Sequence, residues 1–294
     1  MRLWSAVCSL LFAWPTLRML QVAGRRLGRL AWLFASRSRE VTRRNIALCF
    51  PELSFLAREQ LARESVVATA QLALESAAVW SRDPGALDDW VVHVDGKAEF
   101  DAALSEGRGV LCLVPHLGNW EVLNAWLGRH YPFTAMYAPR ENRWLEAWIR
   151  SSRERSGSQL VPTNHAGVRA LLEALQQRRV VGLMPDQVPD DGAGVRTTFF
   201  GNPALTGTLA ARIAMRRESP AFLVCAVRDG SRHGFVISYR KVELPPRAAD
   251  VQAVLTAIGT QVERAVLCHA AQYQWEYKRF KHATPGVDVY KQDR

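Results

Sequence analysis

The stretch VPHLGNWEVL, residues 114–123, places a histidine and a glutamate five positions apart, directly after an apolar run. A carboxylate that accepts a hydrogen bond from one ring nitrogen of His116 would fix its tautomer and leave the other nitrogen free as a general base. Such a base activates a hydroxyl group for attack on a carbonyl, and here the hydroxyl would belong to a substrate. The spacing alone also fits a structural histidine and a glutamate that begins a helix, so both interpretations stay open at this point.

The residues around the pair predict a strand that turns sharply into a helix. The run GVLCLV, residues 109–114, is continuously apolar, as expected for a strand covered on both faces. Gly118 permits a tight turn, and Asn119 is a suitable helix N-cap. Glu121 then falls in the first helical turn, where the helix dipole favours a carboxylate and where it could fold back toward His116.

Elements of the same kinds recur along the chain. Residues 1–85 are predicted to be helical, with Ser54 as an N-cap of one helix. Further strands are predicted at 90–96, 133–139, 180–185, 221–227 and 234–239, and helices at about 206–217 and 249–270 and around the apolar face Val168, Leu171, Leu172 and Leu175. This alternation indicates an α/β fold, with a largely parallel or mixed central sheet flanked by helices and preceded by an N-terminal helical membrane-associated region. His116 and Asp186 each follow a strand, where the active sites of such folds lie.

The N-terminus has a strongly apolar segment, LWSAVCSLLFAWPTL, between Arg2 and Arg18. Seven arginines follow between positions 25 and 44, as is typical of a segment retained on the cytoplasmic side of a membrane, and such a cluster also binds anionic headgroups. We therefore predict an uncleaved membrane anchor or amphipathic region over residues 1–35. A cleaved signal peptide is the less favoured alternative, and a core helix with a solvated basic face is another.

The composition is that of a globular protein with a large core, because 48% of the 294 residues are hydrophobic and 22% are charged. The net charge of +10 calls for an anionic partner: nucleic acid, anionic lipid or an acidic protein. No nucleic-acid-binding motif is present, so we expect no nucleic acid partner. The five cysteines form no C-x-x-C pair and the histidines have no metal-ligand spacing, so we expect no metal and no cofactor. Cys112 lies in a core-like run, which argues against a cysteine nucleophile.

Several segments together carry a resemblance to a known family. The sequence HLGNWE resembles the H-x-x-x-x-(D/E) motif of glycerolipid-type acyltransferases, and its G-N-W-E form resembles the late acyltransferases of lipid A biosynthesis, the lauroyl and myristoyl transferases. The matching segments, in order, are 43–54, 136–157, 182–214 and 272–286. The resemblance covers most of the chain. It implies a single acyltransferase domain over residues 36–294, helical over 36–85 and α/β over 86–294.

The resemblance also implies roles for particular residues. His116 would be the catalytic base and Glu121 its orienting partner. Arg153 matches the arginine of the middle segment, and Asp186 with Gln187 matches the block after the strand at 180–185, so these three are predicted to bind substrate. The chain departs from the family at Ala138, where relatives often have a basic residue.

The implied reaction moves a fatty acyl chain from acyl carrier protein to a hydroxyl group of a Kdo-bearing lipid A precursor. The expected partners are acyl carrier protein, the lipid A precursor and anionic inner-membrane lipid. The expected location is the inner membrane, with the catalytic domain on its cytoplasmic face. The alternatives are an acyltransferase of the same superfamily that acts on a lysophospholipid or ornithine lipid, and a non-catalytic basic adaptor at the membrane surface.

Overall fold

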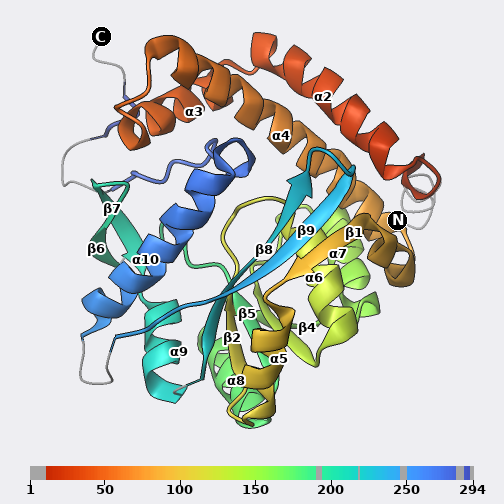
Figure 1. The fold of residues 1–294 in the computed structure, drawn as a ribbon, viewed down its shortest axis with the longest axis vertical. Coiled ribbons are helices and arrows are strands. Elements are labelled where there is room, and N and C mark those ends of the chain that lie inside the picture. Colours follow the sequence, from red (N-terminus) through yellow and green to blue (C-terminus); the bar gives the residue numbers. More distant parts are fainter. Residues whose placement is uncertain (1–10, 190–193, 218, 246–249, 283–287, 292–294) are drawn as a thin grey trace.

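The computed structural model describes residues 11–189, 194–217, 219–245, 250–282 and 288–291, and its centre is a seven-stranded sheet (Figure 1). The strand order is β1-β9-β8-β2-β5-β3-β4. The strands are β1 Val91–Asp95, β2 Val110–Leu113, β3 Phe133–Tyr137, β4 Gln159–Pro162, β5 Val180–Leu183, β8 Ala221–Asp229 and β9 Gly234–Lys241. All neighbouring strands pair in parallel except β8 and β9, which form an antiparallel hairpin. The predicted α/β fold with a mostly parallel, mixed central sheet flanked by helices is confirmed.

The strand β2 shows how the sheet is buried on both faces. Successive side chains of a strand point to opposite faces of its sheet. Leu111 and Leu113 belong to the core cluster that includes α8 and α10, whereas Val110 and Cys112 belong to the cluster that includes α5 and α6. All four side chains are fully buried. The apolar run that predicted this strand is therefore explained by helices on both sides.

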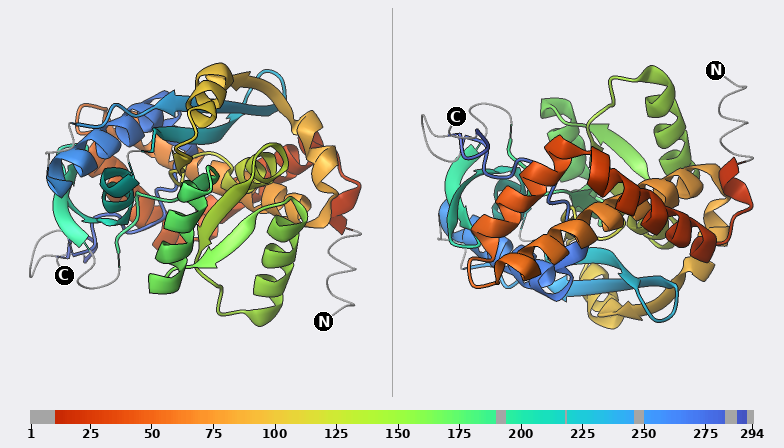
Figure 2. Two further views of the ribbon diagram at one scale, coloured as in Figure 1. Left: turned by 90° about the horizontal axis from the view of Figure 1, so that it is seen from below. Right: turned by 90° about the horizontal axis from the view of Figure 1, so that it is seen from above.

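Helices cover both faces of the sheet and one of its edges. The helices beside the faces are α5 Lys97–Ser105, α6 Trp120–His130, α7 Arg143–Arg155, α8 His165–Gln176, α9 Leu209–Arg217 and α10 Val251–Cys268. The N-terminal helices are α2 Leu17–Phe34, α3 Ser36–Cys49 and α4 Phe55–Ser81. Figure 2 shows these three lying together across one end of the molecule. The long helix α4 thus passes the edge at which β8 ends, and Ser54 caps it as predicted by accepting a hydrogen bond from the Ala57 amide.

The helix α2 packs closely along α4 rather than standing apart from the domain. A Cβ atom at Gly24 would lie 2.6 Å from the Gln71 Cα, and one at Gly28 would lie 2.5 Å from the Val67 Cα, so only glycine allows this approach. Large apolar side chains nevertheless remain exposed along α2, namely Met19, Leu27, Leu30, Leu33 and Phe34. The predicted anchor over residues 1–35 lies partly outside the described residues, and the part that is described, 11–35, contains no helix that meets the length and hydropathy needed to cross a membrane.

Three short strands were not predicted from the sequence. β4 lies at the edge of the sheet, and only one of its four residues is buried, so its sequence lacks an apolar run. β6 Gly194–Phe199 and β7 Asn202–Gly207 form a separate antiparallel hairpin, in which buried side chains alternate with more exposed ones, so neither strand has an apolar run. The helix predicted from about residue 206 begins at Leu209, because residues 202–207 belong to that hairpin.

Candidate active site

Two neighbouring strands bring His116 and Asp186 together. β2 and β5 pair in parallel, with Leu113 opposite Leu183, and the amide of Val114 donates a hydrogen bond to the Leu183 carbonyl at 2.9 Å. His116 and Asp186 stand at the same distance along the chain beyond the paired leucines. Because parallel strands end at the same edge of a sheet, the two side chains emerge beside each other, although 70 residues separate them in sequence.

The Asp186 carboxylate binds His116 at two points. Oδ1 lies 2.8 Å from the His116 Nδ1, and Oδ2 accepts a hydrogen bond from the His116 backbone amide, also at 2.8 Å. Burial opposes ionisation of Asp186, but the histidine and its two hydrogen bonds outweigh burial and lower the pKa of the carboxyl group. An ionised carboxylate only accepts hydrogen bonds, so Nδ1 carries the proton of a neutral ring and Nε2 keeps its lone pair. The His116 side chain is 14% exposed, so a substrate can reach its imidazole ring.

The contact predicted between Glu121 and His116 is wrong. Glu121 does lie in the first turn of α6, where Asn119 caps the helix as predicted. Its carboxylate, however, accepts two hydrogen bonds from Arg153 on α7, at 2.6 Å from Nη2 and 3.1 Å from Nε. A planar guanidinium fits a carboxylate in this two-point geometry. The Glu121 oxygens that were predicted to accept a hydrogen bond from His116 therefore accept from Arg153 instead. Asp186, predicted as a substrate-binding residue, occupies the place beside His116.

The Glu121–Arg153 ion pair is itself almost buried, with side-chain exposures of 4% and 15%. Burial alone would raise the pKa of Glu121, but the charge and hydrogen bonds of Arg153 reverse this and lower it. The guanidinium also stacks on the Tyr137 ring, 4.6 Å from its centroid, and the Tyr137 hydroxyl donates a hydrogen bond to Glu146. The pair therefore joins α6 to α7 and keeps a charged group at the start of α6.

The turn between His116 and α6 is held from two sides. Gly118 has φ +69°, and a Cβ atom there would lie 2.1 Å from the Ala226 carbonyl oxygen on β8, so the turn needs glycine. Asn119 donates a hydrogen bond to Glu75 on α4 at 3.0 Å, and Glu75 also binds Arg228 on β8 at 2.8 Å. Glu75 was not predicted from the sequence. Its signal was a lone carboxylate within an otherwise apolar stretch of helix, ATAQLALESAAVW, which calls for a buried cationic partner.

The C-terminal segment closes the other side of the site. The Gln274 amide donates to the His116 carbonyl at 3.0 Å, and the Gln187 side-chain amide donates to the Gln274 side chain at 3.3 Å. Tyr273 is buried nearby, and burial together with the Asp186 charge raises the pKa of its hydroxyl well above the ordinary value. Gln187, predicted to bind substrate together with Asp186, therefore has its side-chain hydrogen bond with the C-terminal segment.

The described residues around His116 offer neither a reactive thiol nor a cluster of metal ligands. Cys112 is fully buried in β2, and burial raises the pKa of its thiol far above the range in which a thiolate forms. Among the residues that the structure describes, no three histidine, cysteine or carboxylate side chains cluster in a way that could hold a metal ion. The chemistry available is that of a histidine base oriented by an aspartate, beside a buried ion pair.

Comparison with known proteins finds similarity to acyltransferases over nearly the whole chain. Residues 2–282 match the family described as bacterial lipid A biosynthesis acyltransferase. The lipid A biosynthesis palmitoleoyltransferase of Escherichia coli K12 is 25% identical over 265 residues, which cover 90% of this chain and 85% of that protein. The lipid A biosynthesis lauroyltransferase of the same organism is 26% identical, over 89% of this chain and 85% of its own. A phosphatidylinositol mannoside acyltransferase of Mycobacterium tuberculosis H37Rv is 28% identical over 61% of this chain and 57% of its own.

Proposed function

The chain belongs to the bacterial lipid A biosynthesis acyltransferase family, and from this premise we propose the reaction that its site performs. We propose that the protein transfers a fatty acyl chain from an acyl carrier protein thioester to a hydroxyl group of a Kdo-bearing lipid A precursor. The observation that carries the proposal is the hydrogen-bonded pair of His116 and Asp186 at the carboxyl edge of the sheet.

The proposed reaction uses His116 as the general base. Nε2 takes the proton of the acceptor hydroxyl while the hydroxyl oxygen attacks the thioester carbonyl carbon. The carbon–oxygen bond forms, the carbon–sulfur bond breaks, and the proton passes from the imidazolium to the departing thiolate. Asp186 holds the ring in the Nδ1–H tautomer and stabilises the imidazolium that forms in between. The protein itself is never acylated in this scheme, which suits the absence of an accessible thiol among the described residues of the site.

Glu121 and Arg153 have a binding rather than a base role in this proposal. The Glu121 carboxylate is occupied by the guanidinium, so it is not free to take a proton from a substrate hydroxyl. Arg153 is still partly exposed, and its guanidinium places a positive charge where the helix α6 begins. We propose that this charge binds an anionic or carbonyl group of a substrate, while Asp186 acts through His116 and Gln187 supports the C-terminal segment beside it.

The membrane location stays a proposal as well. Along α2, exposed apolar side chains such as Leu27 and Leu30 lie on the same helix as the exposed Arg18 and Arg26. Such a helix can rest on an anionic membrane, with its leucines in the interface and its arginines at the headgroups. We propose that this helix holds the catalytic domain at the cytoplasmic face of the inner membrane, where the acidic acyl carrier protein can reach it.

One experiment tests the substrate. Purified protein is incubated with acyl carrier protein bearing a fatty acyl chain and with a Kdo-bearing lipid A precursor, and the products are identified by mass spectrometry. The proposal predicts a precursor heavier by one acyl chain. Acylation of a phosphatidylinositol mannoside or a lysophospholipid under the same conditions, with none of the lipid A precursor, would contradict it. A relative that acts on phosphatidylinositol mannoside makes that arm necessary.

A further inference from the structure

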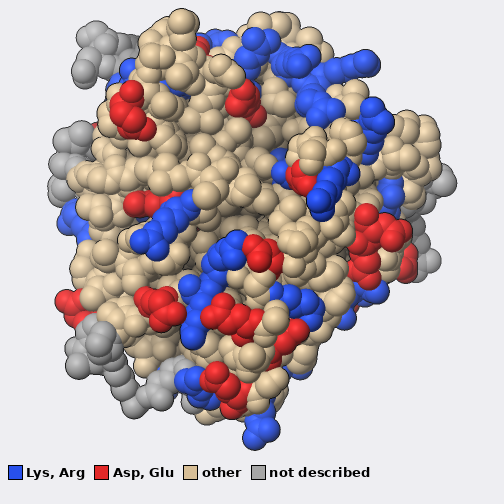
Figure 3. All heavy atoms as spheres, in the orientation of Figure 1, with Lys and Arg blue, Asp and Glu red and all other residues tan. Residues whose placement is uncertain are grey.

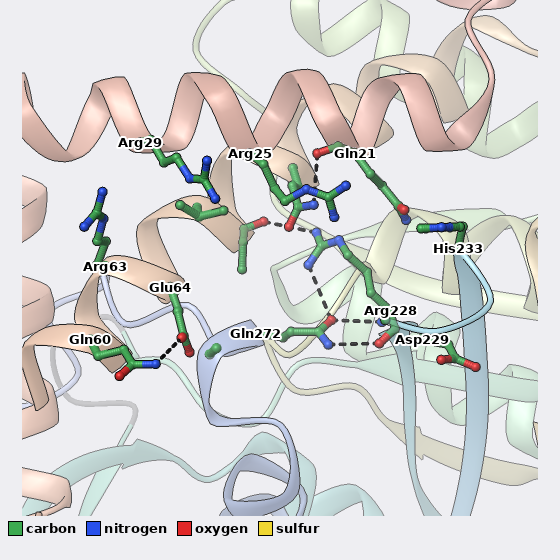
Figure 4. Close-up of a pocket in the computed structure, with 15 residues that line it drawn as sticks. Gln21, Arg25, Arg29, Gln60, Arg63, Glu64, Arg228, Asp229, His233 and Gln272 are labelled. Carbon is green, nitrogen blue, oxygen red and sulfur yellow. Dashed lines mark hydrogen bonds between the residues drawn. The ribbon is translucent and has the colours of Figure 1, made fainter. Parts of the chain in front are cut away.

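A large cavity opens between the N-terminal helices and the hairpin of β8 and β9 (Figure 4). His116 is not among the described residues that line it. Its volume is about 660 Å³, which is the size of a typical small-molecule site and far larger than a single phosphate ion. Arg25 and Arg29 line it from α2, Arg63 from α4, and Arg228 and His233 from the hairpin. Basic side chains thus reach one cavity from three separate elements.

Three of these arginines have no partner of opposite charge in the part of the chain that the structure describes. Among the described residues, Arg25, Arg29 and Arg63 make neither an ion pair nor a side-chain hydrogen bond, whereas Arg228 is neutralised by Glu75. The Lys and Arg side chains gathered over α2 stand out in Figure 3. Guanidinium groups of the same sign that face one space repel one another, and an anion between them removes that cost.

The carboxylates of the cavity do not cancel this charge. Glu64 and Asp229 also line it. Asp229 pairs with Arg232 at 3.8 Å, outside the lining of the cavity. Glu64 accepts a hydrogen bond only from the neutral Gln60, at 2.9 Å, and offsets one positive charge of the three. The three unpaired arginines therefore leave an excess of positive charge in the cavity.

A buried amide gives a second, independent sign of a missing ligand. Gln21 on α2 is 3% exposed, and its Nε2 has no hydrogen-bond partner among the described residues. Its side chain points from α2 into the cavity, toward Arg228 and His233 (Figure 4). A buried donor without an acceptor is rare because it loses the hydrogen bonds that it made to water. An oxygen atom of a bound ligand would supply the acceptor.

The floor of the cavity is joined to the turn that carries His116. Arg228 binds Glu75, and Glu75 accepts a hydrogen bond from Asn119, the cap of α6. In addition, the Gln272 carbonyl accepts from the Gly118 amide at 3.0 Å, while the Gln272 side chain binds the backbone of Arg228. A ligand in the cavity thus contacts the hydrogen-bond network that fixes the start of α6, the helix that follows His116.

We propose that this cavity binds the anionic headgroup of the lipid acceptor, meaning phosphate or carboxylate groups carried on a sugar. This inference rests on the proposed function and names where the acceptor is held. The cavity is far larger than a phosphate ion, and the exposed leucines of α2 place it beside a surface suited to lipid. Two sources share this chemistry: the acceptor itself, and the headgroups of ordinary anionic phospholipids.

The test compares the wild-type protein with a triple variant, Arg25→Gln, Arg29→Gln and Arg63→Gln. Its matched control, Arg169→Gln, Arg178→Gln and Arg212→Gln, removes the same charge from exposed positions on or next to α8 and α9. Binding is measured to phosphatidylcholine vesicles that contain a Kdo-bearing lipid A precursor, and to vesicles in which phosphatidylglycerol gives the same charge density. Thermal unfolding of all three proteins checks that they are folded, and the single variant Arg29→Glu repeats the test with one change.

The wild type and the control variant are expected to prefer the precursor vesicles. The triple variant is expected to lose that preference, with binding weakened about tenfold or more, because charged hydrogen bonds are lost. In acyl transfer its KM for the precursor is expected to rise by a similar factor, with kcat nearly unchanged. No preference in the wild type, or equal losses on both kinds of vesicle, would overturn the inference, and so would a rise only in the KM for acyl carrier protein.

The same measurements separate this inference from the proposed function. Vesicle binding needs no turnover, so preferential binding without acyl transfer would refute the proposed reaction and leave the headgroup site standing. Acyl transfer with an unaltered KM in the triple variant would refute the site alone.

Discussion

The imidazole of His116 is held by one carboxylate at both its ring and its own backbone amide, at 2.8 Å in each case. Two hydrogen bonds from one residue to the two oxygens of Asp186 fix the orientation of the carboxylate as well as that of the ring. Because Asp186 is buried and ionised, its charge is available to stabilise an imidazolium throughout the reaction. At the residue scale, this arrangement makes the tautomer of His116 depend on Asp186.

The substitution Asp186→Asn tests that dependence. An asparagine amide can donate a hydrogen bond to Nδ1 and so favour the wrong tautomer, and we expect kcat to fall about 10³- to 10⁴-fold while the fold persists. Nitrogen-15 NMR of the imidazole is expected to show the proton moving from Nδ1 to Nε2. Asp89→Asn, at an exposed position, is the control. A kcat within a few-fold of wild type would argue against Asp186 as the orienting residue.

The buried pair of Glu121 and Arg153 gives a prediction about stability. Removing one partner leaves the other charge buried and unpaired, so Glu121→Leu or Arg153→Met alone is expected to lower the free energy of unfolding by about 3–5 kcal/mol. The double variant is expected to lose clearly less than the sum of the two, because no unpaired charge remains. Urea denaturation measures all four proteins. Strictly additive losses would mean that the pair contributes no coupling.

The sequence could predict these residues but not their pairing. The positions of His116, Glu121, Arg153 and Asp186 followed from motifs, and all four lie in the two contacts described above. Which carboxylate meets the histidine depends on the register of β2 and β5, which brings together residues 70 positions apart. Spacing along the chain favoured the glutamate five positions away, because local contacts are the only ones that spacing reveals.

At the scale of elements, the contact between α2 and α4 determines which side chains line the cavity. Gly24 and Gly28 let the two helix backbones approach, and this approach places Arg25 and Arg29 opposite Arg63. A larger side chain at either glycine would push α2 away from the Gln71 and Val67 backbone. The headgroup site and the position of α2 therefore depend on the same small residues.

The variant Gly28→Val tests this packing. The added side chain would overlap the Val67 backbone, and overpacking of this kind is expected to cost about 1–3 kcal/mol of unfolding free energy. Limited proteolysis is expected to cut α2 faster, since the helix would detach from α4. The control is Ala23→Val, which places the same valine side chain at an exposed position of the same helix. Equal protease resistance in the two variants would show that the contact between α2 and α4 does not need glycine.

The elements themselves were predictable where their residues are buried. Strands β2, β5 and β8 lie in the middle of the sheet, and their unbroken apolar runs identified them. The strand β4 and the hairpin of β6 and β7 escaped because their side chains alternate between buried and exposed or are mostly exposed. The packing of α2 against α4 also escaped, since the glycines that permit it make no pattern by themselves.

At the scale of the whole molecule, the C-terminal segment ties the N-terminal helices to the active site. Asn45 on α3 is buried and donates hydrogen bonds to the carbonyls of Trp275 and Tyr277, at 2.7 and 2.8 Å. Thr69 on α4 donates to Glu276 at 2.9 Å, and the second oxygen of Glu276 is enclosed without a partner among the described residues. The segment that passes beside His116 is thus fastened to helices from the other end of the chain.

Glu276 makes this connection dependent on pH. Burial raises the pKa of its carboxyl group from 4.5 to about 7. A carboxyl group whose pKa is raised by folding contributes stability that is complete below pH 4.5 and is lost as pH rises through 7.

The substitution Glu276→Gln removes this titration and is expected to stabilise the protein above pH 7, by about 3 kcal/mol, while flattening the pH dependence of stability. Urea denaturation at pH 5 and pH 8 measures it, with the exposed Glu52→Gln as control. An unchanged difference between the two pH values would contradict the raised pKa.

The most direct test of the central claim is acyl transfer by His116→Ala. The purified variant is compared with the wild type and with His93→Ala, which removes an exposed histidine on β1. If His116 is the base, His116→Ala loses about 10³-fold or more of the turnover from acyl carrier protein to the lipid A precursor, and His93→Ala keeps it. Turnover by a folded His116→Ala protein close to that of the wild type would contradict the claim.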